Sequence, residues 1–193
     1  MKISLASDHA GFPLKRVVKE FLAAQAHEIQ DFGTGSTEAA DLSDHAYPAA
    51  LEVSNGRCER AILIDGAGYP SGIIANMLPN VYAAVANDLF SARLSREHSN
   101  ANVLCLGGKV IGEGVALEII SVWLKTEFLG GKYAARAGKV AALGKRHRQA
   151  ADPAIRKVVT VQDVRDALTR KESLLLDETT IITPAVQDLL RSS

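Results

Sequence analysis

Short apolar runs alternate with helical patterns along most of this chain of 193 residues. The run at residues 61–64 is apolar at every position, which is typical of a parallel strand buried on both faces of a sheet. The other expected strands are residues 3–6, 27–32, 81–86 and 103–106. Strands that alternate with helices predict an α/β fold: three layers around a doubly wound parallel sheet of five strands.

The expected strand order is 2-1-3-4-5, because right-handed crossovers leave few other topologies. In that order the first and third strands are neighbours, and ligands bind in the crevice beyond their carboxyl ends. Asp8 and His9 follow the first strand, and the loop at residues 65–68 follows the third. We therefore expect these two polar segments to face each other across a binding site.

A second, smaller module is expected at residues 151–193, after a first domain at residues 1–150. A basic, Ala-rich helix at residues 133–148 ends at Asp152-Pro153. Beyond it, apolar pieces near residues 158–161, 174–176 and 181–182 alternate with helical patterns, which predicts an α+β extension. About forty residues are too few for a stable core of their own, so the extension is expected to dock, to oligomerise or to act in targeting.

Composition excludes some classes of function. Lys plus Arg and Asp plus Glu balance at 22 each, so no bulk field attracts nucleic acid or a membrane. Cys58 and Cys105 lie in or beside apolar segments and lack the spacing of zinc ligands, so we expect reduced, buried thiols and no metal site. The sequence shows neither a signal peptide nor a membrane-spanning run, which favours a cytoplasmic protein.

Each polar element has a functional and a structural interpretation. Asp8 and His9 could bind sugar hydroxyls or move a proton, or Asp8 could cap the following helix. The backbone of Gly66, Ala67 and Gly68 could approach an anion closely, or could form only a tight turn. Ser71 adds a hydroxyl to this loop.

The same ambiguity holds for the cationic side chains later in the chain. His98 ends an expected helix, where a histidine often compensates the helix dipole. Lys132 and Arg136 lie one helical turn apart, so they could bind a phosphate together or form a solvated basic face.

Four stretches together resemble the ribose-5-phosphate isomerase B and galactose-6-phosphate isomerase family: residues 6–11, 64–68, 73–76 and 91–104. The resemblance runs from residue 1 to about 148 and implies an enzyme that interconverts aldose and ketose phosphates without a metal or another cofactor. It implies that Asp8 and His98 open the sugar ring and that His9 contacts substrate or phosphate. It also implies that Lys132 and Arg136 bind phosphate in a partner subunit's site, and hence a homodimer or larger oligomer.

The chain departs from the family pattern at several site positions. Asp65 stands where many members have a proton-abstracting Cys, and Ser71 stands where another branch has a Glu base. Ala67 replaces a Thr and Ser99 replaces an Asn, while Asp41 is kept before a position where Leu42 replaces a substrate-contacting Tyr. We expect the loop residues, Ser99 and Asp41 to contact substrate.

The leading hypothesis is an active isomerase in which Asp65 removes the proton beside the carbonyl to form a cis-enediolate. Because both usual bases are absent, the alternative is a catalytically degenerate homologue that binds a phosphosugar or serves as a structural or cargo subunit. A dinucleotide-binding oxidoreductase is disfavoured, because no Gly-x-Gly-x-x-Gly follows the first strand.

A second resemblance concerns location. The Asp-Gly-Ala-Gly loop is similar to that of a subgroup linked to bacterial microcompartment operons. Residues 161–165 and 182–185 resemble short extensions of microcompartment-associated enzymes. This resemblance implies a microcompartment shell or its cargo as a partner, and the inside of such a compartment as a location.

Overall fold

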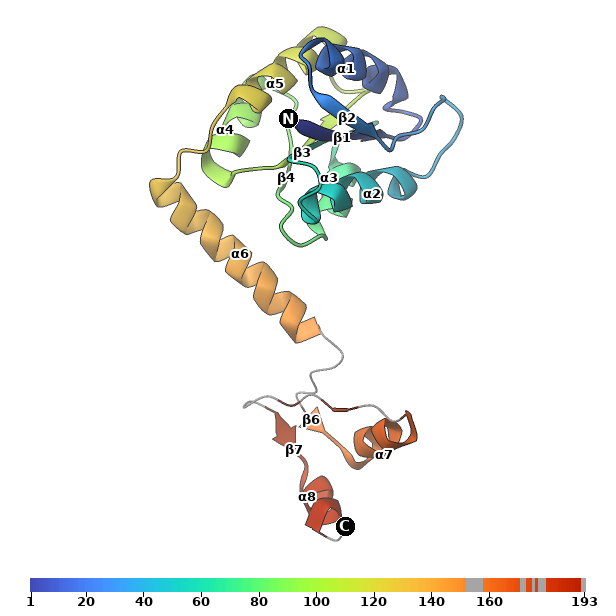
Figure 1. Ribbon diagram of the computed structural model, residues 1–193, viewed down its shortest axis with the longest axis vertical. Helices are drawn as coiled ribbons and strands as arrows, with labels where there is room; N and C mark the ends of the chain where they lie inside the picture. The colour runs from blue at the N-terminus through green and yellow to red at the C-terminus, as the bar shows by residue number, and fades with distance from the viewer. Residues whose placement is uncertain (152–157, 171–172, 175, 177–179, 192–193) are drawn as a thin grey trace. The chain divides into compact units, whose positions relative to one another are not determined.

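A computed structural model describes residues 1–151, 158–170, 173–174, 176 and 180–191. The chain forms two compact units, Met1–Ala141 and Ala142–Ser193. In the first unit, helices cover both faces of a five-stranded parallel sheet (Figure 1), so the predicted three-layer α/β class is confirmed. The functional division expected after residue 150 stays a prediction.

The order of the last two strands differs from the expectation. The strands are β1 (Lys2–Ser7), β2 (Glu28–Asp31), β3 (Arg60–Asp65), β4 (Ala83–Val85) and β5 (Val103–Gly107), in the order β2-β1-β3-β5-β4. The predicted order 2-1-3-4-5 is therefore wrong at one edge. All five residues of β5 are buried, which suits an inner strand, whereas β4 is short and partly exposed, which suits an edge.

Five helices form the outer layers of the first unit. The helices α1 (Phe12–Ala24), α4 (Leu89–Ser99) and α5 (Glu113–Lys125) cover one face, and α2 (Leu42–Ser54) and α3 (Tyr69–Asn76) cover the other. Their opposite placement follows from the strand order. Through α1 and α4 the chain crosses the sheet in one direction, and through α2 and α3 it crosses in the other. Because each crossover is right-handed, the two directions place their helices on opposite faces.

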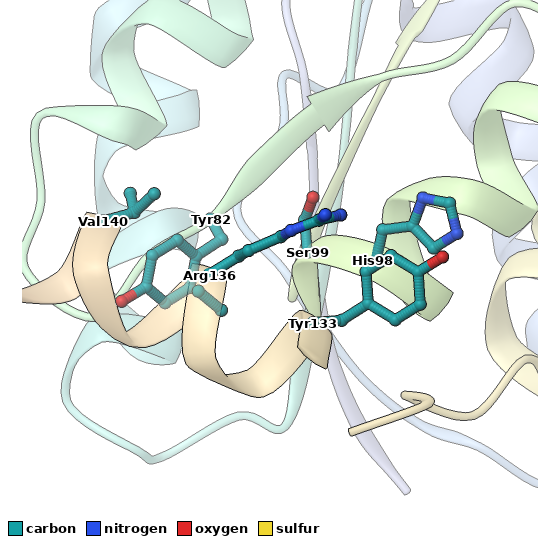
Figure 2. A pocket seen from close by; sticks show the side chains of 7 residues that line it. Tyr82, His98, Ser99, Tyr133, Arg136 and Val140 are labelled. Carbon is teal, nitrogen blue, oxygen red and sulfur yellow. The ribbon is translucent and has the colours of Figure 1, made fainter. Parts of the chain in front are cut away.

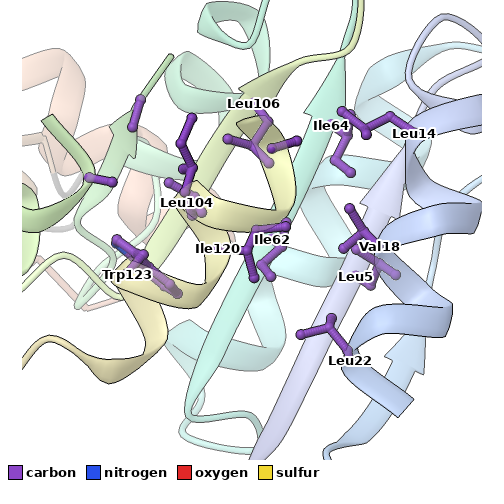
Figure 3. Packing of buried hydrophobic residues seen from close by; sticks show 14 of the residues in the cluster. Leu5, Leu14, Val18, Leu22, Ile62, Ile64, Leu104, Leu106, Ile120 and Trp123 are labelled. Atoms are coloured by element: carbon purple, nitrogen blue, oxygen red, sulfur yellow. The ribbon is translucent and has the colours of Figure 1, made fainter. Parts of the chain in front are cut away.

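Aliphatic rows across the sheet hold the first of these faces. Leu5 pairs in register with Ile62, which pairs with Leu104, and all three side chains are fully buried (Figure 3). Trp123 of α5 is also fully buried and packs in the same cluster. Both cysteines carry free thiols and are buried, as predicted.

The helix α6 (Gly131–Ala151) begins in the first unit and leads into the second. In the second unit β6 (Val158–Val159) and β7 (Ile181–Ile182) pair in parallel. The helix α7 (Val161–Arg170) follows β6, and α8 (Pro184–Arg191) follows β7.

The strand expected at residues 158–161 ends early because Thr160 and Asp163 cap α7 reciprocally: the Thr160 hydroxyl donates to the Asp163 carboxylate, and the Asp163 amide donates to the hydroxyl. Near residues 174–176, Leu174 and Leu176 lie outside regular structure. Leu175 and Asp152-Pro153 lie outside the described residues. None of the described helices has the length and apolarity needed to cross a membrane.

Candidate functional site

The ends of β1 and β3 meet where the winding reverses, as predicted. Asp8 Oδ1 accepts a hydrogen bond from the Gly11 amide at 2.9 Å and so shapes the turn that leads into α1. A Cβ at Gly11 would lie 2.1 Å from the Ile64 carbonyl oxygen, so only glycine lets this turn rest on the end of β3. Asp8 therefore has a structural role in the turn, and the turn lies against the loop that follows β3.

Asp65 organises the loop that follows β3. One carboxylate oxygen accepts from the amides of Ala67 at 2.8 Å and Gly68 at 2.6 Å. The other accepts from the Ser71 amide at 3.0 Å and, through a very short contact, from the Ser71 hydroxyl. Asp65 is 2 % exposed and Ser71 is fully buried. The amides of Ala67 and Gly68 and the Ser71 hydroxyl, which were expected to face a ligand, therefore donate to Asp65 instead.

The end of β5 supplies a cation to the same edge of the sheet, which the sequence analysis missed. The Lys109 amide donates to the Gly66 carbonyl at 3.1 Å, and the Lys109 side chain passes within 3.9 Å of where a Gly66 Cβ would lie. The signal was present as Gly107-Gly108-Lys109 directly after an apolar run, because carboxyl ends of parallel strands share one edge.

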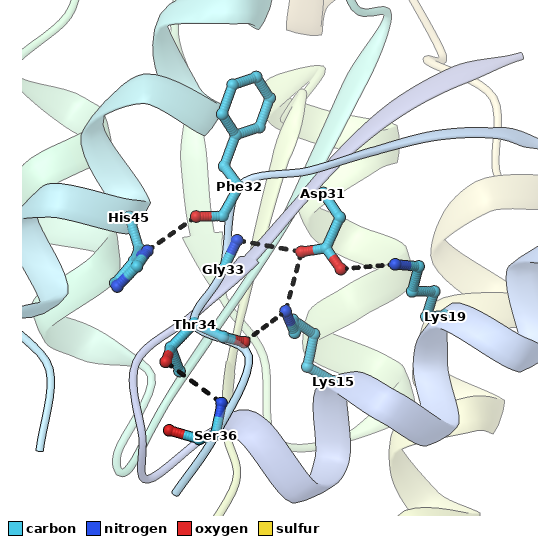
Figure 4. Close-up of polar contacts among 8 residues, drawn as sticks. All are labelled: Lys15, Lys19, Asp31, Phe32, Gly33, Thr34, Ser36 and His45. Atoms are coloured by element: carbon cyan, nitrogen blue, oxygen red, sulfur yellow. Dashed lines mark hydrogen bonds and ion pairs between the residues drawn. The ribbon is translucent and has the colours of Figure 1, made fainter. Parts of the chain in front are cut away.

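The loop after β2 closes another side of this edge. Its position depends on Lys15, which is 3 % exposed and donates to Asp31 Oδ1 and to the Thr34 carbonyl, each at 2.8 Å (Figure 4). Burial would raise the pKa of Asp31, but hydrogen bonds from Lys15, Lys19 and the Gly33 amide outweigh it and lower that pKa.

The far end of the same loop contacts the predicted site residues. His9 Nδ1 lies 3.2 Å from both the amide nitrogen and the carbonyl oxygen of Ala40. The next residue, Asp41, caps α2 by accepting from the Ser43 amide at 2.7 Å. We call Asp8, His9, Asp65 with its loop, and Lys109 the carboxyl-edge cluster.

A second cluster surrounds a pocket of about 280 Å³ near the end of α4 (Figure 2). The side chains that line it are Tyr82, His98, Ser99, Tyr133, Arg136, Ala137 and Val140. Tyr133 stacks on His98, and Lys132 Nζ lies 5.1 Å from the Tyr133 ring centroid. The sequence analysis missed both tyrosines, although Tyr133 stands between two predicted phosphate ligands on an otherwise Ala-rich helix. We call this set the pocket cluster.

The two clusters lie at opposite edges of the sheet within one chain. Because α4 returns the chain from the end of β4 to the start of the parallel strand β5, His98 lies at the starting edge. Hydrogen bonds confirm this: the Asn102 amide, next to the start of β5, donates to the Tyr82 carbonyl. The five residues of β5 span about 17 Å at roughly 3.3 Å per residue, so His98 and Asp8 of one chain cannot contact the same sugar.

Two ionisable side chains near these clusters belong to the scaffold. Arg96 is 2 % exposed and donates to Asn100, Ala101 and Thr126, and burial lowers its pKa to about 10. Cys105 lies behind α3, and burial, together with the nearby Asp65, raises the pKa of its thiol, so it does not replace the missing base. Among the described residues, no three His, Cys, Asp or Glu side chains are placed to hold a metal ion.

Comparisons with known proteins identify relatives that match most of the first unit. Ribose-5-phosphate isomerase B of Escherichia coli is 36% identical over 145 residues, which are 75% of this chain and 97% of that protein. D-erythrulose-4-phosphate isomerase of Pectobacterium atrosepticum is 34% identical over 141 residues, 72% of this chain and 93% of the relative.

Solved structures of ribose-5-phosphate isomerase B also superpose on this chain. Ribose-5-phosphate isomerase B of Clostridium thermocellum superposes with a TM-score of 0.75 at 44% identity, covering 76% of this chain and 99% of that one. The Mycoplasma genitalium enzyme with bound ribulose-5-phosphate gives 0.72 at 34% identity, covering 75% and 96%. The family model described as Ribose/Galactose Isomerase matches residues 3–140. The chain therefore belongs to the ribose/galactose isomerase family.

Proposed function

We propose that this protein is an aldose–ketose isomerase for a small phosphorylated sugar of four or five carbons. The observation that carries the proposal is the carboxyl-edge cluster, in which three neighbouring strands bring two carboxylates, a histidine and a cation to one edge of the sheet. The relatives named for ribose 5-phosphate and D-erythrulose 4-phosphate support this substrate class.

The proposed reaction needs no metal and proceeds in three steps. Asp8 and His98 open the sugar ring by moving a proton from the anomeric hydroxyl to the ring oxygen. Asp65 then removes the proton from C2 of the aldose, and the electron pair forms a cis-enediolate. The proton of the C2 hydroxyl then moves to O1, and Asp65 returns its proton to C1, which leaves the carbonyl at C2 of the ketose. Lys109, Lys132 and Arg136 supply positive charge for the phosphate.

The proposed working unit is at least a homodimer, because each chain holds the two halves of a site at opposite edges. A second copy whose pocket cluster faces the carboxyl-edge cluster would complete it. An exposed apolar row on α3 and its C-cap supports such a contact: Tyr69, Ile73 and the capping residue Met77 are 61%, 63% and 78% exposed and recur every fourth residue. Since α3 begins in the loop organised by Asp65, a copy that covers this row would also approach that loop.

A second candidate function rests on the hydrogen bonds of Asp65. A carboxylate that already accepts from three amides and a hydroxyl must release at least one of them before it can take a proton from carbon. The alternative is therefore a phosphosugar-binding homologue without turnover, in which Asp65 only maintains the loop.

The second unit is proposed to serve association rather than chemistry. Its parallel pair of two-residue strands is small, and Leu168 and Ile181 are 73% and 62% exposed. We propose a cytoplasmic enzyme whose C-terminal extension docks on a second subunit or on a microcompartment component.

Deuterium exchange separates the two candidate functions. Purified protein is incubated in heavy water with ribose 5-phosphate, erythrose 4-phosphate and a hexose 6-phosphate, and deuterium is measured at C2 of the aldose and C1 of the ketose. An isomerase incorporates deuterium into at least one of the two smaller sugars. A protein that binds these sugars but leaves every C2 proton in place is the degenerate homologue.

A further inference from the structure

Tyr133 lies at the centre of the pocket cluster. Its ring stacks on the His98 imidazole with centroids 4.0 Å apart and planes inclined by 8°. Two cations flank the same ring: Lys132 Nζ is 5.1 Å and Arg136 Cζ is 5.6 Å from its centroid. Figure 2 shows the Tyr133 ring against His98, with Arg136 reaching toward Ser99.

This arrangement has physical consequences for all three neighbours. A parallel stack restricts the plane of the imidazole and hence the direction of both ring nitrogens. Lys132 and Arg136 repel each other before an anion arrives, and the negative face of an aromatic ring offsets part of that repulsion. Tyr133 is half-buried, whereas Lys132 and Arg136 are exposed and would otherwise sample many rotamers.

We infer that Tyr133 is a positioning residue, which orients His98 for ring opening and holds Lys132 and Arg136 ready for the substrate phosphate. The inference rests on the proposed function for its catalytic half only. Its binding half concerns the pocket cluster itself and is tested without turnover.

A pentose phosphate and a tetrose phosphate distinguish the effect of Tyr133 on His98 from its effect on Lys132 and Arg136. A pentose 5-phosphate closes into a furanose through its 4-hydroxyl. Opening breaks the bond between C1 and that oxygen, the proton of the anomeric hydroxyl moves to the ring oxygen, and C1 becomes the aldehyde carbon. In a tetrose 4-phosphate the same oxygen carries the phosphate, so no such ring forms. Only the pentose therefore needs His98 as a ring-opening group, while both sugars need the cations.

The kinetic test compares Tyr133→Phe with Tyr133→Leu on ribose 5-phosphate and erythrose 4-phosphate. Loss of the ring in Tyr133→Leu is expected to raise KM for both sugars by about tenfold, the size of one or two cation–π contacts. It is expected to lower kcat for ribose 5-phosphate several-fold more than kcat for erythrose 4-phosphate. Tyr133→Phe keeps the ring, so its KM and kcat should lie much closer to those of the parent enzyme than the values of Tyr133→Leu do. Phe90→Leu is the matched control, because it removes an exposed aromatic ring with Arg93 over its face at the other end of α4.

Two measurements on the full chain do not need turnover. Titration with inorganic phosphate should give weaker binding for Tyr133→Leu than for Tyr133→Phe. The His98 ring-proton resonance, identified by its loss in His98→Gln, should move when the stacked ring is removed in Tyr133→Leu.

The outcomes remain distinguishable. An unmodified protein that turns over neither sugar defeats the proposed function. If the phosphate and resonance changes still appear, the binding half of the inference stands. Equal phosphate affinity, an unmoved resonance or equal loss of kcat on both sugars in a folded Tyr133→Leu overturns the positioning role.

Discussion

Asp65 shows how a single side chain can hold a loop and carry a proposed catalytic role. Its position after the central strand was predictable, because Asp65 ends an apolar run and precedes two loop glycines. Its four hydrogen bonds were not, because the path of the loop depends on Gly68, whose φ of +87° places it against β5. The sequence therefore located the residue, and only the geometry showed that both oxygens are engaged.

We expect Asp65→Asn to abolish turnover and also to loosen the loop. Backbone amides donate to both carboxylate oxygens of Asp65. In either orientation the NH2 group of the asparagine side chain would therefore face another donor, which costs about 1–3 kcal/mol. Thermal unfolding and titration with inorganic phosphate should both register the change. Asp8→Asn is the control for stability only, since a single amide donates to Asp8 and the asparagine oxygen can keep that hydrogen bond. Undiminished isomerisation in Asp65→Asn would exclude Asp65 as the base.

At the scale of elements, the alternation of strands and helices and the meeting of β1 with β3 followed from the sequence. The order of β4 and β5 did not, because both read as apolar runs and only their burial in the assembled sheet separates an edge from an inner strand. The separation of His98 from Asp8 was implicit in the order of elements. A helix that leads into a parallel strand ends at the edge where the strands begin, whereas Asp8 lies at the edge where they end. The motif comparison concealed this by placing both residues in one site.

Lys15 ties α1 to the loop after β2, and its loss should have a pH-dependent cost. Lys15→Met leaves the largely buried Asp31 with only Lys19 and the Gly33 amide as donors, which is expected to lower the free energy of unfolding by about 2–4 kcal/mol at pH 7. Since the folded-state pKa of Asp31 lies below its ordinary value, this stabilisation is present above about pH 4 and fades as the pH falls through the lowered pKa.

Denaturant titrations at pH 7 and pH 3 measure the difference. Lys19→Met is the matched control, because the Lys19 side chain is 51% exposed and its pair is expected to contribute less than about 1 kcal/mol. Equal losses in the two variants, or a difference that grows toward pH 3, would contradict the account of this network.

At the scale of the whole molecule, family membership concerns the first unit and leaves the second unexplained. The family match ends at residue 140, and the second unit begins at Ala142. No predicted site residue lies beyond Arg136, whereas large apolar side chains such as Leu168 and Ile181 are exposed there. Chemistry and association are therefore expected to separate along the chain.

Truncation after Ala151 is expected to leave the rate per site within a few-fold of the full chain while changing oligomer size or targeting. Steady-state kinetics and light scattering on the truncated protein measure the two effects separately. Loss of activity at unchanged fold and subunit count would assign the extension to the active site instead.

Two copies of this chain are proposed to build each sugar-phosphate isomerase site, and activity after mixing two kinds of variant subunit depends on that sharing. Asp8→Asn removes a residue of the carboxyl-edge cluster, and Arg136→Ala removes one of the pocket cluster. Each variant alone should turn over ribose 5-phosphate poorly. After unfolding and refolding at equal ratio, about half the dimers are mixed and each holds one intact site, so about a quarter of the parent activity should return. Verified mixed dimers that regain no activity above either parent variant would contradict the shared site.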